Sequence, residues 1–336
     1  MTLRKYLAKR IVVGIITLFI VATLNFVIFV LQPSDPTRYL LQPGMKPEQK
    51  EMIAREYGLR DPLDVRYLKY LRNMFSYGLI PPYFGISFKS KQTVASEMSW
   101  RMQLTVLLLG SAMIGRTIVG IPAGIFAAAK RGGKLDVAIM GCALLTFGIP
   151  IFVLQLLSIF FFSYLANIYG IRIFPTGGGL GGPYNSFWEF LPGAAWHLSL
   201  PILVLTFGGF GGWALYTRNM LIDALTQDYI VTARAKGLSE RTVLYKHAFK
   251  SILPPVATMI TLSIPGIVTG AIITETIFGL EGIGKWYVES LSRGSPNYPV
   301  VQAVLFIFAT LTIMFNIIAD LLYGVLDPRI RVGARR

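Results

Sequence analysis

The sequence has few charged residues and a single cysteine. Charged residues make up 15% of the 336-residue chain, against roughly 25% in ordinary soluble domains. Hydrophobic residues make up 54%, and a water-soluble fold could not hide that much apolar surface. The lone Cys142 lies in an apolar run, which excludes a disulfide framework within the chain and a thiolate metal cluster. We therefore expect the chain to fold in a lipid bilayer.

Basic residues nevertheless outnumber acidic ones by 32 to 17, which gives a net charge of +15. In a soluble protein this excess would suggest nucleic-acid binding. Here the basic residues fall between long apolar runs, a placement typical of topology signals and of contact with anionic lipid head groups. We expect the bilayer, and no nucleic acid, as a partner.

Six apolar segments are long enough to cross a membrane, because a span needs about 20 residues at ~1.5 Å per residue. The sequence thus predicts an all-α integral membrane protein with six transmembrane helices. Prolines that interrupt or open these helices could mark flexing points or simple kinks; they are Pro122, Pro150, Pro201, Pro254, Pro255 and Pro265. The six segments are 11–31, 104–129, 137–166, 198–217, 252–274 and 299–319.

The distribution of Lys and Arg predicts the orientation, because basic residues near span ends stay in the cytoplasm. With both termini inside, the cytoplasmic segments carry 17 basic residues. The two short outer loops carry only Arg172, Lys285 and Arg293. The remaining outer basic residues lie in segment 33–102, which is long enough for the rule to lose force. We predict a multi-pass protein with both termini in the cytoplasm.

The first outer segment is predicted to be a small helical region. Residues 46–57 are Pro-initiated and rich in Glu, Lys and Met, and residues 64–75 carry Val65, Leu68, Leu71 and Phe75 at helical spacing. The predicted division of the chain is a cytoplasmic tail with the first span (1–31), an extracytoplasmic region (32–102), a core transmembrane domain (103–326) containing a cytoplasmic loop (218–251), and a basic cytoplasmic tail (327–336).

The two histidines, His197 and His247, lie on opposite sides of the membrane in this topology. They therefore cannot form a haem pair or a zinc site together. His197 beside Trp196 is interpreted as an interfacial anchor, and His247 as a surface or loop-packing residue. Because no Ser-His-Asp arrangement or spaced carboxylate pair stands out either, we expect neither an enzyme nor a bound cofactor or metal.

The cytoplasmic loop between the fourth and fifth segments has a helix-turn-helix pattern. A helical stretch begins at Asp228, breaks at Gly237 and restarts at Ser239, a favoured N-cap residue. By itself the pattern fits a solvated hairpin that anchors two spans as well as it fits a binding element. One face of the hairpin could be lined by Tyr229, Ala233 and Leu238.

This loop resembles the cytoplasmic EAA loop of ABC importer permeases, specifically the dipeptide/oligopeptide (peptide/nickel-type) branch. The resemblance rests on Tyr229 to Gly237, Leu238-Ser-Glu-Arg241 and Lys246-His-Ala248. Other stretches that resemble this branch extend over most of the chain; they are 33–36, 47–49, 58–62, 274–284, 298–302, 320–323 and 326–331.

The sequence departs from the pattern of the branch at three places. Val231 and Thr232 occupy the first two EAA positions, so that only the second Ala, Ala233, and Gly237 survive. Ser251 stands where the branch usually has Asn. An insertion-like stretch at 294–297 could alter the outer rim, which leaves the detailed substrate open.

The resemblance implies a type I ABC importer permease arrangement that moves di- or oligopeptides, oligosaccharides or nickel by alternating access. It implies a prokaryotic inner membrane, a second homologous permease subunit, two cytoplasmic ATPase subunits that hold ATP and magnesium, and an extracytoplasmic substrate-binding protein. It further implies that the loop's coupling helix docks on an ATPase through small residues and a charged rim. The expected residues are Asp228, Tyr229, Ala233, Arg234, Ala235, Lys236, Gly237, Leu238 and Glu240.

Two other classes of function remain as alternatives. An ion-coupled secondary transporter should show repeated halves and ionisable residues near the membrane midplane. Only Arg116 and Asp320 approach that description. A scaffold subunit of a membrane enzyme is disfavoured by the lack of haem or metal ligands.

Arg116 is the one charged residue in the middle of a predicted span. Because such charges are costly, Arg116 is a candidate for the translocation path, with Glu275 as its counter-charge and second candidate. Alternatively, Arg116 pairs with a neighbouring helix or snorkels, and Gly110, Gly115 and Gly120 allow close helix packing.

Residues 279–286, Gly-Leu-Glu-Gly-Ile-Gly-Lys-Trp, nearly match a phosphate-binding P-loop. Trp286 stands where Ser or Thr must ligate magnesium, and the predicted topology puts the segment outside, away from ATP. We interpret it as a Gly-rich turn after the fifth span, followed by a short amphipathic helix.

Overall fold

The computed structural model describes residues 3–30, 48, 60–76, 79, 84–171, 173–175, 178, 180, 187–268, 272–292 and 296–326. In this part of the chain helices dominate, and one isolated bridge joins Ile86 to Thr93. The elements are α1 (Leu3–Val30), α4 (Leu63–Phe75), α5 (Val94–Ala129), α6 (Lys134–Gly148), α7 (Ile151–Ile159), the π-helical turn η1 (Phe160–Leu165), α8 (Ala166–Ile168), α9 (Phe187–Leu225), α10 (Asp228–Ala235), α11 (Glu240–Thr242), the π-helical turn η2 (Val243–Phe249), α12 (Lys250–Val268), α13 (Ile272–Ile277), α14 (Ile283–Ser290) and α15 (Tyr298–Leu326).

Within the described residues, five helical segments are long and apolar enough to cross a membrane. Four of them, in α1, α5, α9 and α15, match predicted spans. The fifth, Ile151–Ile168, is only the second half of predicted segment 137–166. Predicted segment 252–274 is occupied by α12 and α13, with 269–271 outside the described residues. The six-span count stays a prediction.

Predicted segment 137–166 is divided at Pro150, one of the prolines expected to interrupt or open a span. α6 ends at Gly148, and α7 begins only at Ile151. Ile149 between them has an extended backbone, with φ −87° and ψ 125°, because a residue that precedes a proline is disfavoured from the helical region. By contrast, Pro122 and Pro201 lie inside the continuous helices α5 and α9.

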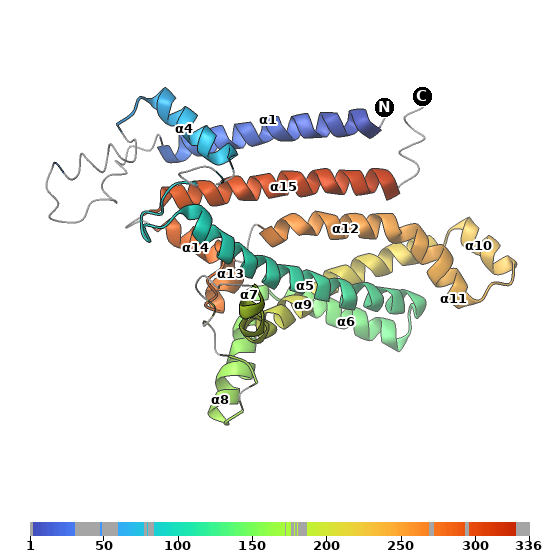
Figure 1. Cartoon of the computed structure of the whole chain (residues 1–336). Coiled ribbons are helices and arrows are strands. Elements are labelled where there is room, and N and C mark those ends of the chain that lie inside the picture. The colour runs from blue at the N-terminus through green and yellow to red at the C-terminus, as the bar shows by residue number, and fades with distance from the viewer. Residues whose placement is uncertain are drawn as a thin grey trace.

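The helices form an elongated bundle in which α1 lies against α15, α15 against α12, and α5 against α9 (Figure 1). The start of α1, the end of α15 and the α10–α11 segment lie at one end, which we call the coupling end (Figure 1). Helices α4, α13 and α14 lie toward the opposite end (Figure 1).

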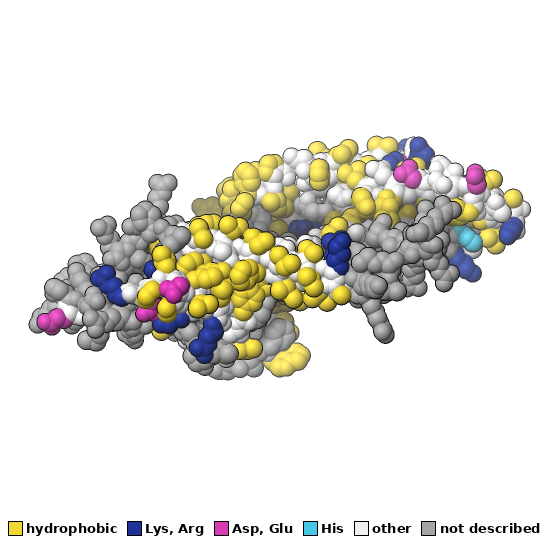
Figure 2. All heavy atoms as spheres, turned by 90° about the horizontal axis from the view of Figure 1, so that it is seen from above, with side chains coloured by type: hydrophobic (Ala, Val, Ile, Leu, Met, Phe, Trp, Pro, Cys, Tyr) yellow, Lys and Arg dark blue, Asp and Glu magenta, His cyan; other side chains and the backbone are white. Residues whose placement is uncertain are grey.

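The face of α1 that points away from the bundle is apolar. Ile11, Ile15 and Phe19 on this face are 48%, 58% and 47% exposed. Figure 2, which looks onto this side of the molecule, shows a band of hydrophobic side chains with charged side chains at or beyond its ends. Lipid is the solvent that such a surface requires, and the protein is therefore a multi-pass membrane protein.

Close contact between α5 and α9 depends on glycines. A Cβ at Gly120 would lie 2.6 Å from the Cβ of Trp213, and one at Gly124 would lie 2.8 Å from the Cβ of Thr217. A Cβ at Gly115 would likewise collide with Thr206. Close packing through Gly115 and Gly120 is thus confirmed, whereas nothing lies within 4 Å of a Cβ at Gly110.

The helix predicted over 64–75 is confirmed by α4, which packs Tyr70 and Met74 into a core shared with α1 and α15. Leu68, expected on the same face, is instead 65% exposed. Apart from residue 48, the helix predicted over 46–57 lies outside the described residues.

Candidate functional site

The coupling segment, residues 228–249, has the predicted break and restart. α10 ends at Ala235, and Gly237 adopts φ +74°, a left-handed conformation that glycine tolerates best. The Ser239 side chain then accepts a hydrogen bond from the Thr242 N–H at 3.4 Å and caps α11. The sequence signals at Gly237 and Ser239 therefore fix the local geometry.

Helix α10 is packed on the ends of the long helices. Ile230 and Ala233 are 0% and 5% exposed. They belong to an apolar cluster, the coupling core, which draws on α5, α9, η2 and α12: Ile125, Ala128, Leu221, Ala224, Ile230, Ala233, Val243, Ala248, Ile252 and Val256. α10 is therefore anchored in an apolar cluster that also includes residues of α5, α9 and α12.

The expected position of Ala233 on this face is wrong. Ala233 does not share an exposed face with Tyr229 and Leu238, since Ala233 is buried while the other two are 43% and 38% exposed. The sequence analysis did not identify Ile230 as a buried residue of this helix. Its spacing of three residues from Ala233, which puts both on the same face of a helix, was the available signal. Ala235 and Gly237 remain exposed as small residues, whereas Ala233 is covered by the chain itself.

Two charged residues of the coupling segment form an exposed ion pair. Arg234 Nε and Nη2 donate to the two Glu240 carboxylate oxygens at 2.8 and 3.2 Å, across the Gly237 turn. This pairing lowers the pKa of Glu240 and raises the pKa of Arg234 from their ordinary values. Asp228 and Lys236 of the same segment are exposed as well.

A cavity of about 600 Å³ opens between the coupling segment and the ends of α5 and α9. The Arg234 and Glu240 pair lies on its wall, together with Lys130, Arg131 and Arg241. Its apolar lining includes Ala128, Ala129, Ile222, Leu225 and Leu244. The coupling end thus offers a basic, partly apolar hollow next to the exposed turn.

A partly buried ion pair near the coupling end was not predicted. Arg218 of α9 donates to both carboxylate oxygens of Asp136 at 2.6 and 2.7 Å. The Gly132 N–H donates to the same carboxylate at 2.9 Å. Opposite charges close to the ends of two predicted spans were the only sequence signal, and their pairing depends on the contact between α6 and α9.

Arg116 and Glu275 do not pair. Arg116 Nε donates to the Leu205 carbonyl of α9 at 2.8 Å, and its side chain lies over Gly209. Glu275 instead accepts a hydrogen bond from Thr105, eleven residues and therefore ~16 Å along α5 from Arg116. Glu275 is therefore not the counter-charge of Arg116, which bonds to a neighbouring helix instead, while a role for Arg116 in the translocation path stays a prediction.

Glu275 is enclosed by its own chain. Its side chain is 0% exposed and accepts hydrogen bonds from Thr105 Oγ1 at 2.6 Å and from the Lys285 N–H at 2.8 Å. Next to it, Gln155 Nε2 donates to Thr274 Oγ1 at 2.6 Å. These contacts join α5, α7, α13 and α14, while a role for Glu275 in the translocation path stays a prediction.

The P-loop-like segment has the structure expected of a turn. It follows the short helix α13 rather than a strand, and α14 begins at Ile283. Trp286 is buried in α14. The interpretation as a Gly-rich turn followed by a short helix is confirmed.

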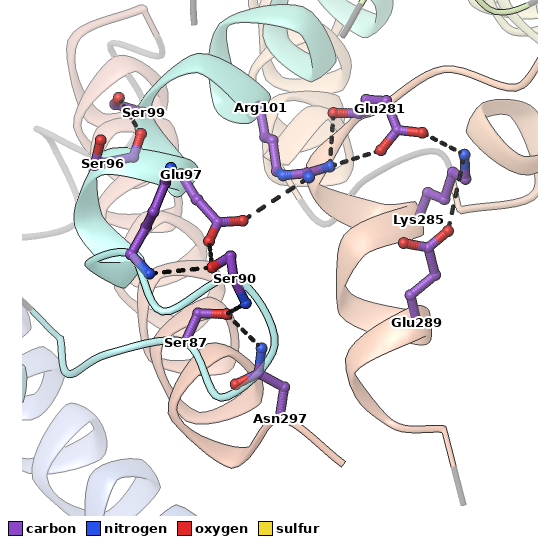
Figure 3. Close-up of polar contacts among 11 residues, drawn as sticks. Ser87, Ser90, Ser96, Glu97, Ser99, Arg101, Glu281, Lys285, Glu289 and Asn297 are labelled. Carbon is purple, nitrogen blue, oxygen red and sulfur yellow. Dashed lines mark hydrogen bonds and ion pairs between the residues drawn. The ribbon is translucent and has the colours of Figure 1, made fainter. Parts of the chain in front are cut away.

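A polar network binds this end of the bundle together (Figure 3). Arg101 donates to Glu281 at 3.0 Å, and Lys285 contacts the other oxygen of the same carboxylate at 2.6 Å. Burial raises the pKa of Glu281, but these two cations outweigh it and hold the pKa below its ordinary value. Asn297, in the insertion-like stretch, donates to Ser87 at 2.8 Å, so the stretch ends inside the network.

Comparison with known proteins identifies the family. The family described as binding-protein-dependent transport system inner membrane component matches residues 120–332, and the N-terminal family of such membrane components matches residues 3–109. The chain belongs to this family of transport permeases. The resemblance stated from the sequence is thereby confirmed, and the permease is a transport subunit rather than an enzyme.

Individual relatives agree with this assignment. The oligopeptide transport system permease protein AppB of Bacillus subtilis (strain 168) is 36% identical over 97% of this chain and 98% of its own. The dipeptide transport system permease protein DppB of Escherichia coli (strain K12) is 34% identical, with the same coverage. The ion-coupled alternative finds no support among these relatives.

The fold is also that of a solved ABC importer. A chain of the MetNI methionine ABC transporter, solved in inward-facing conformations, matches with a TM-score of 0.53 and 18% identity. The match covers 68% of the permease and 96% of that chain. The type I ABC importer arrangement is therefore confirmed at the level of fold.

Proposed function

We propose that the chain is one of two pore-forming subunits of an ATP-driven importer that carries di- or oligopeptides across a prokaryotic cell membrane by alternating access. The substrate class is supported by relatives named for oligopeptide and dipeptide transport. The partners in this proposal are a second, homologous permease subunit, two cytoplasmic ATPase subunits and an extracytoplasmic substrate-binding protein. ATP and magnesium are held by the ATPase subunits.

The proposal rests on one observation: the coupling segment is exposed on one side and anchored in the bundle on the other. Tyr229 and Leu238 are exposed on the outer side of the hairpin, whereas Ile230 and Ala233 anchor it in the coupling core. A partner that grips the exposed side would move the anchored side with it. The Arg234 and Glu240 pair, Asp228, Ala235, Lys236 and Gly237 form the rest of the proposed ATPase contact.

The proposed topology places the coupling end in the cytoplasm. It is supported by the basic residues that follow α5 and flank α10, and by the start of α1, the end of α15 and α10 at the same end of the bundle (Figure 1). In this topology region 32–102, α13 and α14 are extracytoplasmic, and the tails 1–10 and 327–336 are cytoplasmic. Arg116 remains the candidate residue of the translocation path.

Site-directed crosslinking tests the coupling contact. The natural Cys142 is exposed, so a Cys142→Ser background is used in the complex reconstituted with its ATPase subunits. Lys236→Cys is expected to crosslink to the ATPase, while Leu68→Cys, also exposed but on α4, is not. Labelling Lys236→Cys from the outside of intact cells, or finding no ATPase in the purified complex, would contradict the proposal.

Substrate class is tested by peptide uptake into proteoliposomes that contain the full complex. ATP-dependent uptake of a labelled dipeptide or pentapeptide is expected, with competition by unlabelled peptide. If an oligosaccharide or a nickel complex competes and peptides do not, the permease has a different substrate class from the one proposed.

A further inference from the structure

The P-loop-like segment 279–286 surrounds a side-chain carboxyl group of the same chain, that of Glu275. The Lys285 N–H at the start of α14 donates to Glu275 Oε2 at 2.8 Å, and Gly284 lies beside the same carboxyl oxygen. Successive backbone N–H groups at a helix start favour anions, which is how P-loops hold phosphate. Glu275 occupies the corresponding place here.

The glycines of the segment are explained by this carboxylate. A Cβ at Gly282 would collide with the Glu275 carboxyl group. A Cβ at Gly284 would lie 3.1 Å from Glu275 Oε2 and 3.0 Å from Ile272 Cγ1. The Gly-Ile-Gly spacing thus lets the backbone close around the anion.

Thr105 extends the site to α5. Its hydroxyl donates to Glu275 Oε1 at 2.6 Å and accepts a hydrogen bond from the Ile283 N–H at 3.0 Å. Thr105 and Glu275 are both 0% exposed, so water does not compete for these bonds. One turn earlier on α5, Arg101 donates to Glu281 at 3.0 Å and lies 5.1 Å from the ring centre of Trp286 in α14.

The other end of α5 belongs to the coupling core, in which Ala128 packs with Ile230 and Ala233. α5 therefore connects the coupling segment with α14 through one continuous helix of 36 residues. Because α14 is attached tightly to α5 at Thr105, a shift of α5 would also shift α14.

We propose that Glu275 is a positioning residue of the transport cycle, whose buried carboxylate fixes α14 to α5 so that displacement at the coupling segment is carried to the opposite end of the bundle. This inference rests on the proposed import function for its transport consequence, while the joint itself can be measured without transport. It assigns Glu275 a mechanical role inside the subunit rather than contact with the transported molecule.

The joint is tested by hydrogen–deuterium exchange of the complete complex in proteoliposomes. In Glu275→Ala, exchange at residues 283–286 is expected to speed up by about tenfold or more, since hydrogen bonds to a buried charge are lost. Added acetate, which can enter the vacated space and accept the same bonds, restores protection, whereas neutral acetamide does not. Unchanged exchange in Glu275→Ala would overturn the joint.

The transport role is tested by the amount of peptide imported per ATP hydrolysed, normalised to assembled complex. Glu275→Ala is expected to lower this ratio by about fivefold or more, and acetate to raise it again. Glu275→Gln keeps the shape of the side chain but replaces the carboxyl group by an amide, and we expect it to lower the ratio. Because the Gln side chain fills the space, acetate should not rescue this variant. Glu289→Ala, on the exposed end of α14, is the matched control and keeps the ratio.

The two measurements separate the possible failures. Faster exchange with an unchanged import ratio would overturn the positioning role while the joint stands. If acetate restores exchange protection in Glu275→Ala but does not raise its lowered import ratio, the positioning role is overturned as well. If the wild-type complex imports no peptide, the proposed function fails, and the exchange experiment still decides the joint.

Discussion

Arg234 and Glu240 join the two helices of the coupling segment through a bidentate ion pair that crosses the Gly237 turn, with Nε to Oε1 at 2.8 Å. Both side chains are exposed, at 44% and 71%. Pairs this exposed contribute little to global stability. We therefore expect the pair to set the shape of the turn that meets the ATPase, which is a matter of transport rather than folding.

The ion pair is tested by exchanging its charges. Arg234→Glu is expected to reduce peptide import per ATP without a measurable change in the melting temperature of the purified permease. The double variant Arg234→Glu with Glu240→Arg should recover import, because the pair is rebuilt in reverse. A double variant as defective as the single one would show that the individual side chains, and not their pairing, matter.

The pair should also respond to acid. Because the pKa of Glu240 is lowered in the folded protein, the pairing is fully present above the ordinary pKa of Glu240 and is lost as pH falls through the lowered value. Infrared titration of isotope-labelled Glu240 should show this lowered pKa in the wild type and a normal one in Arg234→Gln. Equal titration in both proteins would contradict the pairing.

Gly237 allows charge and conformation to be separated. Asp and Asn both tolerate the left-handed conformation better than other side chains, and nothing lies within 4 Å of a Cβ at this position. Gly237→Asp, which adds a negative charge at the turn, is expected to uncouple ATP hydrolysis from import. Gly237→Asn is the control and should import nearly as well as the wild type in vesicles.

The close approach of α5 to α9 should make Gly124 intolerant of larger residues. Gly124→Val would press on Thr217 and on the backbone of α9, and overpacking of this kind costs about 1–3 kcal/mol. We expect a lower melting temperature for the purified permease. Gly141→Val is the control, since nothing lies within 4 Å of a Cβ there, and it should melt like the wild type.

Substitution of Arg116 tests whether this residue lines the translocation path or only packs against a neighbouring helix. Arg116→Gln is expected to reduce uptake, with the larger effect on acidic peptides if the guanidinium faces the path. Gly209→Ala disturbs the same side chain from the opposite helix, because its Cβ would collide with Arg116, and should give a similar but weaker defect. Unchanged uptake and assembly in Arg116→Gln would contradict the hypothesis that Arg116 belongs to the translocation path.

Local signals were sufficient to predict the coupling segment. The break at Gly237 and the cap at Ser239 depend on the backbone preferences of single residues, which the sequence contains. The burial of Ile230 and Ala233 depends on where the ends of α5, α9 and α12 lie, which the sequence of the loop does not contain. The predicted face was therefore wrong although the helices were right.

The same limit explains the other differences. Hydropathy predicted one span over 137–166 because it averages across Pro150, whose effect on Ile149 is a backbone effect. The pairs Asp136 with Arg218 and Glu275 with Thr105 join residues far apart in sequence, and only the packing of the helices brings them together. Charge alone suggested Arg116 as the partner of Glu275, without regard for the distance along α5.

The uninterrupted length of α5 turns small rotations into large displacements. Its 36 residues correspond to ~54 Å at ~1.5 Å per residue, well beyond the ~30 Å of membrane hydrocarbon. A tilt of about 5° around one end moves the other by roughly 5 Å for a rod of this length. A tilt of about 5° around the Ala128 end of α5 would shift Arg101 by roughly 3 to 4 Å, more than the width of a water molecule.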